Sequence, residues 1–115
     1  KPWVGGSSPP ERAKIMYFVY LILKKNNKKY ISYVGYTNNI KNRIKKHNNG
    51  KGAKFTRGSF WQLAYFKKYL NKSKAMREEA KLKKNSKLRK KIKSNFIYSI
   101  QSGYGNPLDF KNLTL

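Results

Sequence analysis

Two apolar segments near the start of the chain have the pattern of paired β-strands. Residues 17–23 (YFVYLIL) form a continuous run rich in aromatic and β-branched side chains, which is typical of a buried strand. The polar stretch 24–29 (KKNNKK) contains two asparagines, which tolerate the left-handed backbone of tight turns. Residues 30–36 (YISYVGY) again favour a strand. The pattern therefore predicts a β-hairpin.

Gly35 is unusual because it lies inside the second predicted strand. A glycine weakens a strand unless a bulge or a close backbone approach requires it. We expect Gly35 to open space beside Tyr20 and Tyr33, which lie on the two adjacent strands. On the hairpin alone, the simplest interpretation of the two tyrosines is an aromatic cross-strand pair.

The next segment has the spacing of an amphipathic helix. Thr37 or Asn38 can cap a helix that runs to about Asn48, and Ile40 and Ile44 then form its buried stripe.

Arg43 and His47 are spaced i, i+4, so they meet on one side of this helix, at the edge of the core. Taken singly, Arg43 is one cation among 28, and His47 is favoured near a helix C-terminus by the dipole. Neither residue alone therefore indicates a functional site.

A glycine-rich basic loop follows at residues 48–58 (NNGKGAKFTRG). Its cations Lys51, Lys54 and Arg57 suit contact with a phosphate backbone, and Phe55 offers a stacking surface. These four residues are the candidate nucleic-acid contacts.

The remaining pattern predicts a third strand and two more helices. Residues 60–69 favour the strand, and Ser73 is a plausible cap for a helix over residues 74–84. Ser86 can cap a last helix that runs to Ser102. Its inward residues are expected to be Leu88, Ile92 and Phe96, its lysines face mostly outward, and Gly103 ends it.

Glu79 is the most informative residue of the helix expected over residues 74–84. On a helical wheel it falls within the apolar arc, whereas Glu78 falls outside it; the arc consists of Ala75, Met76, Ala80 and Leu82. An acid facing a core must pair with a cation, bind a metal or become neutral. A buried Glu–Arg ion pair and a hard-cation ligand are equally good interpretations.

The composition narrows the class of partner. Lys and Arg total 28 against 4 Asp and Glu, which gives a net charge of +24 and favours a polyanionic partner. The chain has no cysteine, which excludes disulfides, thiolate zinc sites and a cysteine nucleophile. No apolar run approaches the roughly 20 residues of a membrane span.

The 115 residues suit one domain with flanking segments. Residues 1–15, rich in Gly, Ser and Pro, are interpreted as a leader or linker, either vector-derived or native. The domain is expected over 16–102, followed by a turn-rich tail at 103–115.

Five elements in this order resemble the GIY-YIG nuclease family, over roughly residues 16–84. They are Phe18-Val19-Tyr20, Tyr33-Val34-Gly35, the segment 42–48 with its Arg-x-x-x-His spacing, the loop 50–58, and Arg77-Glu78-Glu79-Ala80. The loop is similar to that of small single-domain bacterial members. Phe18 stands where the first motif has glycine, and the spacing between the two tyrosine motifs is longer than usual.

The resemblance implies an α+β fold with a small three-stranded, largely antiparallel sheet flanked by helices, in the order β-β-α-β-α-α. It also implies a metal-dependent endonuclease that hydrolyses DNA phosphodiester bonds. The implied catalytic residues are Tyr20, Tyr33, Arg43, His47 and Glu79, with one Mg²⁺ or Mn²⁺ on Glu79.

In this interpretation Tyr20 acts as general base on the water or relays its proton, His47 shares the relay, and Arg43 clamps the phosphate; the choice of base between Tyr20 and His47 stays open. The pKa of a phenol is ordinarily about 10. We therefore expect nearby cations to favour the Tyr20 phenolate.

The implied partner is DNA, with RNA as an open alternative, in repair or recombination inside the cell, cytoplasmic or nucleoid-associated. A homodimer or a protein partner could use the C-terminal helix, whereas no membrane or small-molecule substrate is expected. Two other hypotheses remain: a non-catalytic basic nucleic-acid-binding module that retains the fold, and a ribosomal or chromatin-like structural protein.

Overall fold

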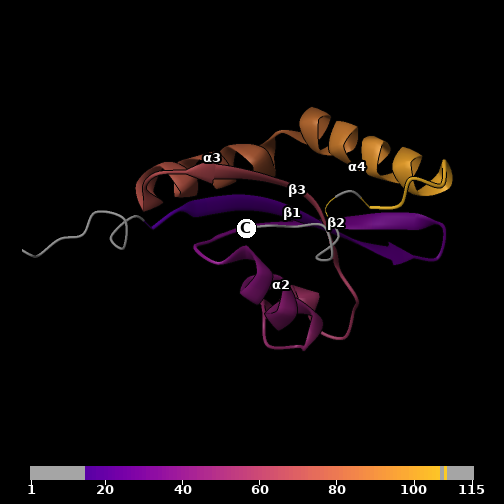
Figure 1. The fold of residues 1–115 in the computed structure, drawn as a ribbon, viewed down its shortest axis with the longest axis horizontal. Coiled ribbons are helices and arrows are strands. Elements are labelled where there is room, and N and C mark those ends of the chain that lie inside the picture. Colours follow the sequence, from indigo (N-terminus) through magenta and orange to yellow (C-terminus); the bar gives the residue numbers. More distant parts are fainter. Residues whose placement is uncertain (1–14, 107, 109–115) are drawn as a thin grey trace, which may run out of the picture.

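A three-stranded antiparallel sheet separates one helix on one face from two helices on the other (Figure 1). The computed structural model describes residues 15–106 and 108. In chain order its elements are β1 (Tyr17–Asn26), β2 (Lys29–Thr37), α2 (Ile40–Asn48), the short 3-10 helix η2 (Lys54–Thr56), β3 (Gln62–Tyr69), α3 (Lys72–Lys84) and α4 (Ser86–Gln101). The strand order is β2-β1-β3. The predicted α+β class and element order are confirmed.

The expected domain boundaries stay predictions. Residues 1–14 of the expected leader, and 107 and 109–115 of the expected tail, lie outside the described part of the chain.

The hairpin turn is tighter than expected. Both strands continue to a two-residue turn at Asn27 and Lys28, so the polar stretch 24–29 is mostly strand. Asn27 has a φ of 60°, the left-handed conformation that asparagine tolerates. The turn chemistry is thus confirmed, and the strand lengths were underestimated because polar residues can pair beyond the edge of the core.

Each long helix begins at an asparagine rather than at the residue expected from the sequence. The caps are Asn39, Asn71 and Asn85, not Thr37 or Asn38, Ser73 and Ser86. Each asparagine Oδ1 accepts a hydrogen bond from the backbone N–H three residues later, at distances of 3.1, 2.7 and 3.0 Å respectively. Asparagine and serine are nearly equal as caps, so neighbouring candidates cannot be separated by residue type alone.

Side chains of β1 alternate between two apolar cores, because successive residues of a strand point to opposite faces. The core beneath α3 and α4 consists of Val19, Leu21, Leu23, Val34, Ala75, Leu82, Ile92 and Phe96. The core beneath α2 consists of Phe18, Tyr20, Ile22, Ile40, Ile44, Trp61 and Leu63. The expected stripe of Ile40 and Ile44 is confirmed. Tyr20 is therefore held against α2, in the interior of the protein.

β3 and α4 depart from expectation at their first residues. β3 starts at Gln62, because Phe60 is 71% exposed and Trp61 turns into the core. In α4, Ile92 and Phe96 are buried as expected, whereas Leu88 lies at the margin, 36% exposed. Gly103 follows the end of α4 with a φ of 83°, as expected for a terminating glycine.

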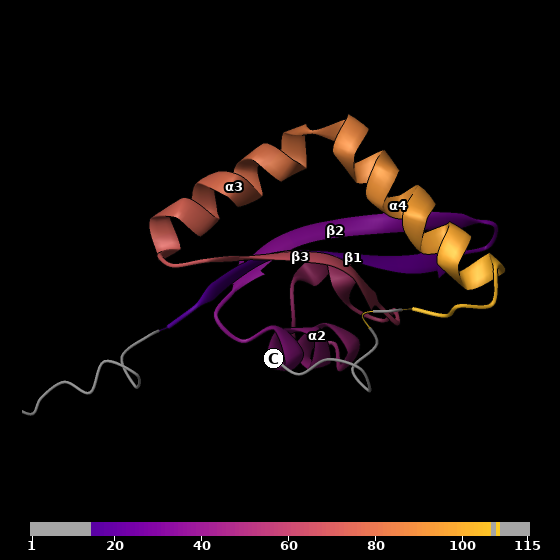
Figure 2. The same cartoon turned by 45° about the horizontal axis from the view of Figure 1, so that its top comes forward.

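α3 and α4 form an inverted V above the sheet (Figure 2). At their junction Arg89 Nη1 donates hydrogen bonds to the carbonyl of Leu82, at 2.9 Å, and to that of Lys83. These carbonyls belong to the last turn of α3, where helical partners are lacking. Arg89 therefore links the start of α4 to the end of α3.

Within the described residues, no helix combines the length and the apolar character that a membrane crossing requires.

Candidate active site

Tyr20 lies at the centre of β1, with its ring over a glycine. Its Cα partner on β2 is Gly35, and a Cβ added to Gly35 would lie 2.5 Å from the Tyr20 Oη. The expectation that Gly35 opens space is confirmed. The expected direct pair of Tyr20 with Tyr33 is wrong, because Tyr33 faces Ile22. The missing side chain makes room for the phenol ring.

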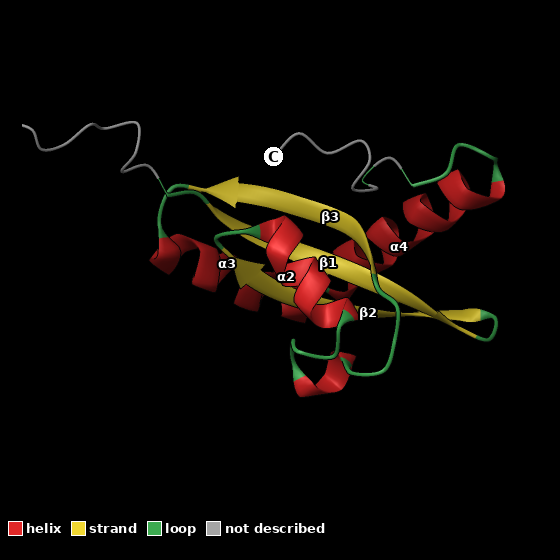
Figure 3. Ribbon diagram, turned by 60° about the horizontal axis from the view of Figure 1, so that its bottom comes forward, coloured by secondary structure: helices red, strands yellow, loops and turns green. Residues whose placement is uncertain are grey.

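α2 brings two polar side chains to the Tyr20 hydroxyl (Figure 3 shows α2 against the sheet). The Tyr20 Oη lies 2.8 Å from His47 Nε2, and Arg43 Nε donates to the same oxygen at 3.3 Å. Tyr20 and His47 are both fully buried, whereas Arg43 is half-buried. The i, i+4 pair thus converges on the first tyrosine motif, with Arg43 nearest to solvent.

Thr56 determines which nitrogen of His47 carries the proton. Its hydroxyl donates to the carbonyl of Ala53 at 2.8 Å, so it must accept from His47 Nδ1, also at 2.8 Å. The neutral ring therefore has its proton on Nδ1 and an open lone pair on Nε2. The Tyr20 O–H donates to that lone pair. The result is a directed chain of hydrogen bonds from Tyr20 through His47 to Thr56.

Burial keeps both members of the Tyr20–His47 pair neutral. Desolvation raises the pKa of Tyr20 to about 12, although the hydrogen bond and the charge of Arg43 lower it. Desolvation, followed by the charge of Arg43, lowers the pKa of His47 to about 4. The hydrogen bond to Tyr20 in turn raises the pKa of Arg43. The expectation that cations favour the phenolate is wrong for the unbound protein, because burial outweighs the one nearby guanidinium.

Tyr33 belongs to an aromatic cluster beside this chain. Its ring contacts His47 edge to face at 5.2 Å between centroids, and stacks on Phe55 at 6.2 Å with 21° between the planes. Trp61 borders both Tyr33 and Phe55. Phe55 is 60% exposed, so its outer side faces solvent. The stack extends from the buried histidine to the surface.

The basic loop carries Phe55, the exposed end of this stack. Lys51, Lys54 and Arg57 are all exposed, and η2 places Phe55 between the latter two. The predicted loop residues are therefore all open to solvent, as is the outer side of Phe55.

Several residues that hold the loop in place have no recognisable signal in the sequence. Thr56 fixes the histidine tautomer, and a Cβ on Gly52 would lie 2.5 Å from His47 Nδ1. Trp61 Nε1 donates to the carbonyl of Thr56 at 2.9 Å. Asn48 Oδ1 accepts a hydrogen bond from the backbone N–H of Trp61 at 2.6 Å, and Asn48 Nδ2 donates one to the carbonyl of Trp61 at 3.1 Å. These contacts depend on loop closure, which spacing along the chain does not encode.

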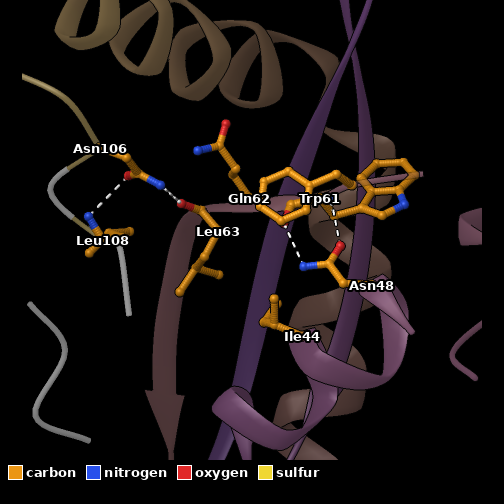
Figure 4. Close-up of a pocket in the computed structure, with 8 residues that line it drawn as sticks. Ile44, Asn48, Trp61, Gln62, Leu63, Asn106 and Leu108 are labelled. Carbon is orange, nitrogen blue, oxygen red and sulfur yellow. Dashed lines mark hydrogen bonds between the residues drawn. The ribbon is translucent and has the colours of Figure 1, made fainter. Parts of the chain in front are cut away.

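A small pocket lies on another side of α2 (Figure 4). Asn106, which lines it, donates a hydrogen bond to the carbonyl of Leu63. The other lining residues are Ile44, Asn48, Phe60, Trp61, Gln62, Leu63 and Leu108. Tyr20, Arg43 and His47 do not line it. The pocket is therefore separate from the candidate active site.

Glu79 lies on α3, at the border of its buried stripe. Ala75 and Leu82 are buried, but Met76 is 46% exposed and Ala80 is also exposed, so the predicted apolar arc is partly wrong. The Glu79 side chain is 18% exposed, against 28% for Glu78. Its ion-pair partner is Lys83, at 3.7 Å, rather than an arginine. The charge of Glu79 is the smallest of the causes that raise the pKa of Tyr20. α3 covers the face of the sheet opposite to α2, and among the described residues no hydrogen bond or ion pair joins Glu79 to Tyr20, Arg43 or His47.

A divalent ion at Glu79 would have few protein ligands. Among the described residues, no group of three or more His, Cys, Asp or Glu is arranged to hold a metal. Mg²⁺ keeps several waters and commonly uses one or two carboxylates together with substrate phosphate. A half-buried carboxylate with one long ion pair suits that mode of binding. It does not suit a metal site built from protein ligands alone.

Comparison with known proteins agrees with these motifs. A family model described as the GIY-YIG catalytic domain matches residues 16–93, more than half of the chain. A UPF0213 protein of Oceanobacillus iheyensis is 52% identical over 52 residues, 44% of this chain and 60% of that protein. A UPF0213 protein of Clostridium perfringens is 44% identical over 77 residues, 64% of this chain and 80% of that protein.

A solved structure also matches, the solution NMR structure of a UPF0213 protein from Bacillus halodurans. It is 34% identical, covers 85% of this chain and 99% of its own, and has a TM-score of 0.39. The chain spans about three fifths of the Oceanobacillus relative. Because the family model covers both tyrosine motifs, Arg43, His47 and Glu79, this chain belongs to the GIY-YIG family of nucleases.

Proposed function

We propose that the protein is a divalent-metal-dependent endonuclease that hydrolyses DNA phosphodiester bonds. The observation that carries this proposal is the directed hydrogen-bond chain from Tyr20 through His47 to Thr56, with Arg43 on the same hydroxyl. A protein that only bound nucleic acid would gain nothing from a buried phenol with its proton aimed at an open imidazole nitrogen. Family membership supports the same class of activity.

His47 is the proton acceptor for Tyr20, and Tyr20 is the general base for the attacking water. When Tyr20 takes a proton from water, it passes its own proton to His47 Nε2. His47 Nδ1 keeps its own proton and continues to donate it to the Thr56 hydroxyl, which keeps the ring oriented throughout. In the unbound protein the low pKa of His47 opposes this transfer.

A phosphate bound to Arg43 reduces that opposition, although burial, the larger cause of the low pKa of His47, remains. The Arg43 charge is one cause of the low His47 pKa, so an anion beside the guanidinium raises the proton affinity of His47. Arg43 also contacts the fully buried Tyr20 hydroxyl from the solvent side. When Arg43 turns to clamp a phosphate, it opens a path for water to that hydroxyl. Substrate binding and base activation are thereby coupled.

DNA is positioned by the loop and the aromatic stack. Lys51, Lys54 and Arg57 contact the phosphate backbone, and Phe55 offers its exposed side to a base or sugar. Tyr33, stacked beneath Phe55 and in contact with His47, orients the phosphate or the water.

Glu79 is the proposed protein ligand of the metal, Mg²⁺ or Mn²⁺. When bound, the ion would neutralise charge on the phosphate and on the leaving oxygen. α3 lies on the face of the sheet opposite to α2, so Glu79 fills this role only where the bound phosphate reaches past the edge of the sheet and the ion pair with Lys83 is exchanged for the metal.

Plasmid nicking with Mg²⁺ or Mn²⁺ tests the proposal. The wild type is compared with Glu79→Ala and with Glu78→Ala, the adjacent acid, whose partner is Lys81. Tyr20→Phe removes the phenol oxygen only. We expect Glu79→Ala and Tyr20→Phe to bind DNA but to lose about 10²-fold or more in cleavage. Glu78→Ala is expected to cut as the wild type does.

Two results would contradict the proposal. If the wild type never cuts plasmid, branched DNA or RNA but binds them, the protein is a binding module that retains the fold. If Glu78→Ala and Glu79→Ala lose cleavage equally, the assignment of the metal ligand is wrong.

A further inference from the structure

The outward face of α4 carries a row of lysines that the candidate active site does not use. Lys87, Lys90 and Lys91 are spaced i, i+3, i+4 and are all exposed. The buried residues Ile92 and Phe96 turn α4 toward the sheet, so this row, the α4 lysine row, faces solvent. α4 contains no acidic residue that could neutralise it.

Two local rules oppose this arrangement. Like charges at i, i+3 and i, i+4 destabilise a helix, and Lys87 has these spacings to Lys90 and Lys91. Cations are also unfavourable near a helix N-terminus, and the row occupies the first two turns of α4. By contrast, the basic last turn of α3 complements its helix dipole. A bound polyanion would relieve both of the unfavourable effects in α4.

Arg89 keeps the row on a fixed support. Arg89 lies between these lysines in the sequence, but its side chain turns toward α3. There it donates hydrogen bonds to the carbonyls of Leu82 and Lys83. Holding the junction of α3 and α4 rigid lowers the cost of presenting several cations together. The row is thus pre-arranged and does not lie on a free segment.

The row lies on the side of the sheet opposite to α2 and the basic loop (Figures 1 and 2). A duplex held at the loop would be separated from α4 by the sheet. The two basic surfaces therefore face opposite sides of the sheet.

We propose that the α4 lysine row binds the phosphate backbone of a second DNA segment while the first lies at the candidate active site. The role of the first segment rests on the proposed function. Charge complementarity identifies the occupant as a polyanion, and the polar outward face argues against a lipid surface, because an interfacial helix needs an apolar face to insert. One protein molecule would thereby hold two DNA segments side by side.

Energy transfer between two short duplexes, one with a donor dye and one with an acceptor dye, tests the proposal. The protein is kept below the duplex concentration, and a chelator removes divalent metal so that no DNA is cut. The row variant is Lys87→Gln with Lys90→Gln and Lys91→Gln. The matched control is Lys25→Gln with Lys28→Gln and Lys29→Gln, three exposed lysines near the hairpin turn.

We expect the wild type and the control to bring the duplexes together and the row variant to lose most of the transfer signal. The row variant should still bind one duplex. The salt dependence of the second binding step should become shallower by about one unit of logarithmic slope per lysine lost. Circular dichroism checks that α4 still forms.

Three outcomes would overturn the proposal. The row variant could bridge as the wild type does, or the control could lose bridging equally, which would indicate net charge alone. The row could instead bind anionic vesicles without bridging DNA. Plasmid nicking separates these results from the proposed function: a protein that bridges but never cuts keeps this inference and loses the nuclease, and one that cuts without bridging does the reverse.

Discussion

At the scale of single residues, Thr56 is the contact that gives the Tyr20–His47 pair its direction. Its hydroxyl proton is committed to Ala53, so the imidazole proton must sit on Nδ1. We expect Thr56→Val to abolish this preference and Thr56→Ser to keep it. Nitrogen-15 NMR of the ring measures the tautomer directly, because His47 is the chain's only histidine.

The NMR result is independent of nuclease activity. If wild type and Thr56→Val have the same ring tautomer, Thr56 does not determine it. If the tautomer changes but cleavage does not, the proton chain has no part in the reaction.

His47 also gives folding stability a definite dependence on pH. The pKa of this side chain is about 4 in the folded protein, against 6.5 as the ordinary value. Between these values the unfolded chain binds more protons than the folded one, so stability falls as pH drops from 6.5 toward 4. Urea unfolding of wild type should follow this course, with a shallower slope for His47→Gln. A titration of the ring near 6.5 would contradict it.

The sequence could indicate the principal candidate site residues but not their protonation states. Arg43 and His47 are one helical turn apart, and the resemblance to the GIY-YIG family connected this pair with the tyrosine motifs of β1 and β2. The pKa of Tyr20 was expected to move downward because the chain is highly basic. Burial decides it instead, and the extent of burial depends on how α2 and the loop close over the ring.

At the scale of elements, Asn48 joins the end of α2 to the start of β3. Its amide pairs with both backbone groups of the buried Trp61 (Figure 4). We expect Asn48→Ala to destabilise the protein by about 1–3 kcal/mol, because two backbone groups lose their partners. Urea unfolding measures the change. Asn49→Ala, at the exposed neighbouring position, is the control and should change little. Equal losses would contradict the role assigned to Asn48.

Element types could be predicted from the sequence better than element ends and helix faces. Apolar runs identified all three strands, and i, i+4 spacing identified the helices. The caps were displaced because asparagine and serine compete at neighbouring positions. The apolar arc of α3 was drawn too wide, since only Ala75 and Leu82 reach the core. The hydrophobic pattern of a helix does not show which neighbouring element covers each of its sides.

At the scale of the whole molecule, the net charge of +24 makes salt act in opposite directions on folding and on DNA binding. Salt screens repulsion among the cations, so the thermal midpoint should rise as sodium chloride is added. DNA affinity should fall over the same range, because counterion release drives binding. Thermal unfolding and DNA titration in one buffer series test both. A midpoint that falls with salt would indicate that specific ion pairs outweigh the repulsion.

Gly35 also determines how β1 aligns with β2. β1 presents apolar side chains to both faces of the sheet. If β1 shifted by one residue relative to β2, its side chains would change faces, and apolar groups would still be buried on each side. Hydrophobicity alone therefore specifies the alignment weakly. The Tyr20 ring breaks this near-equivalence, since it needs a facing position without a side chain, and Gly35 is the one glycine in β2. The tyrosine proposed to act on water thus also selects the register in which the hairpin forms.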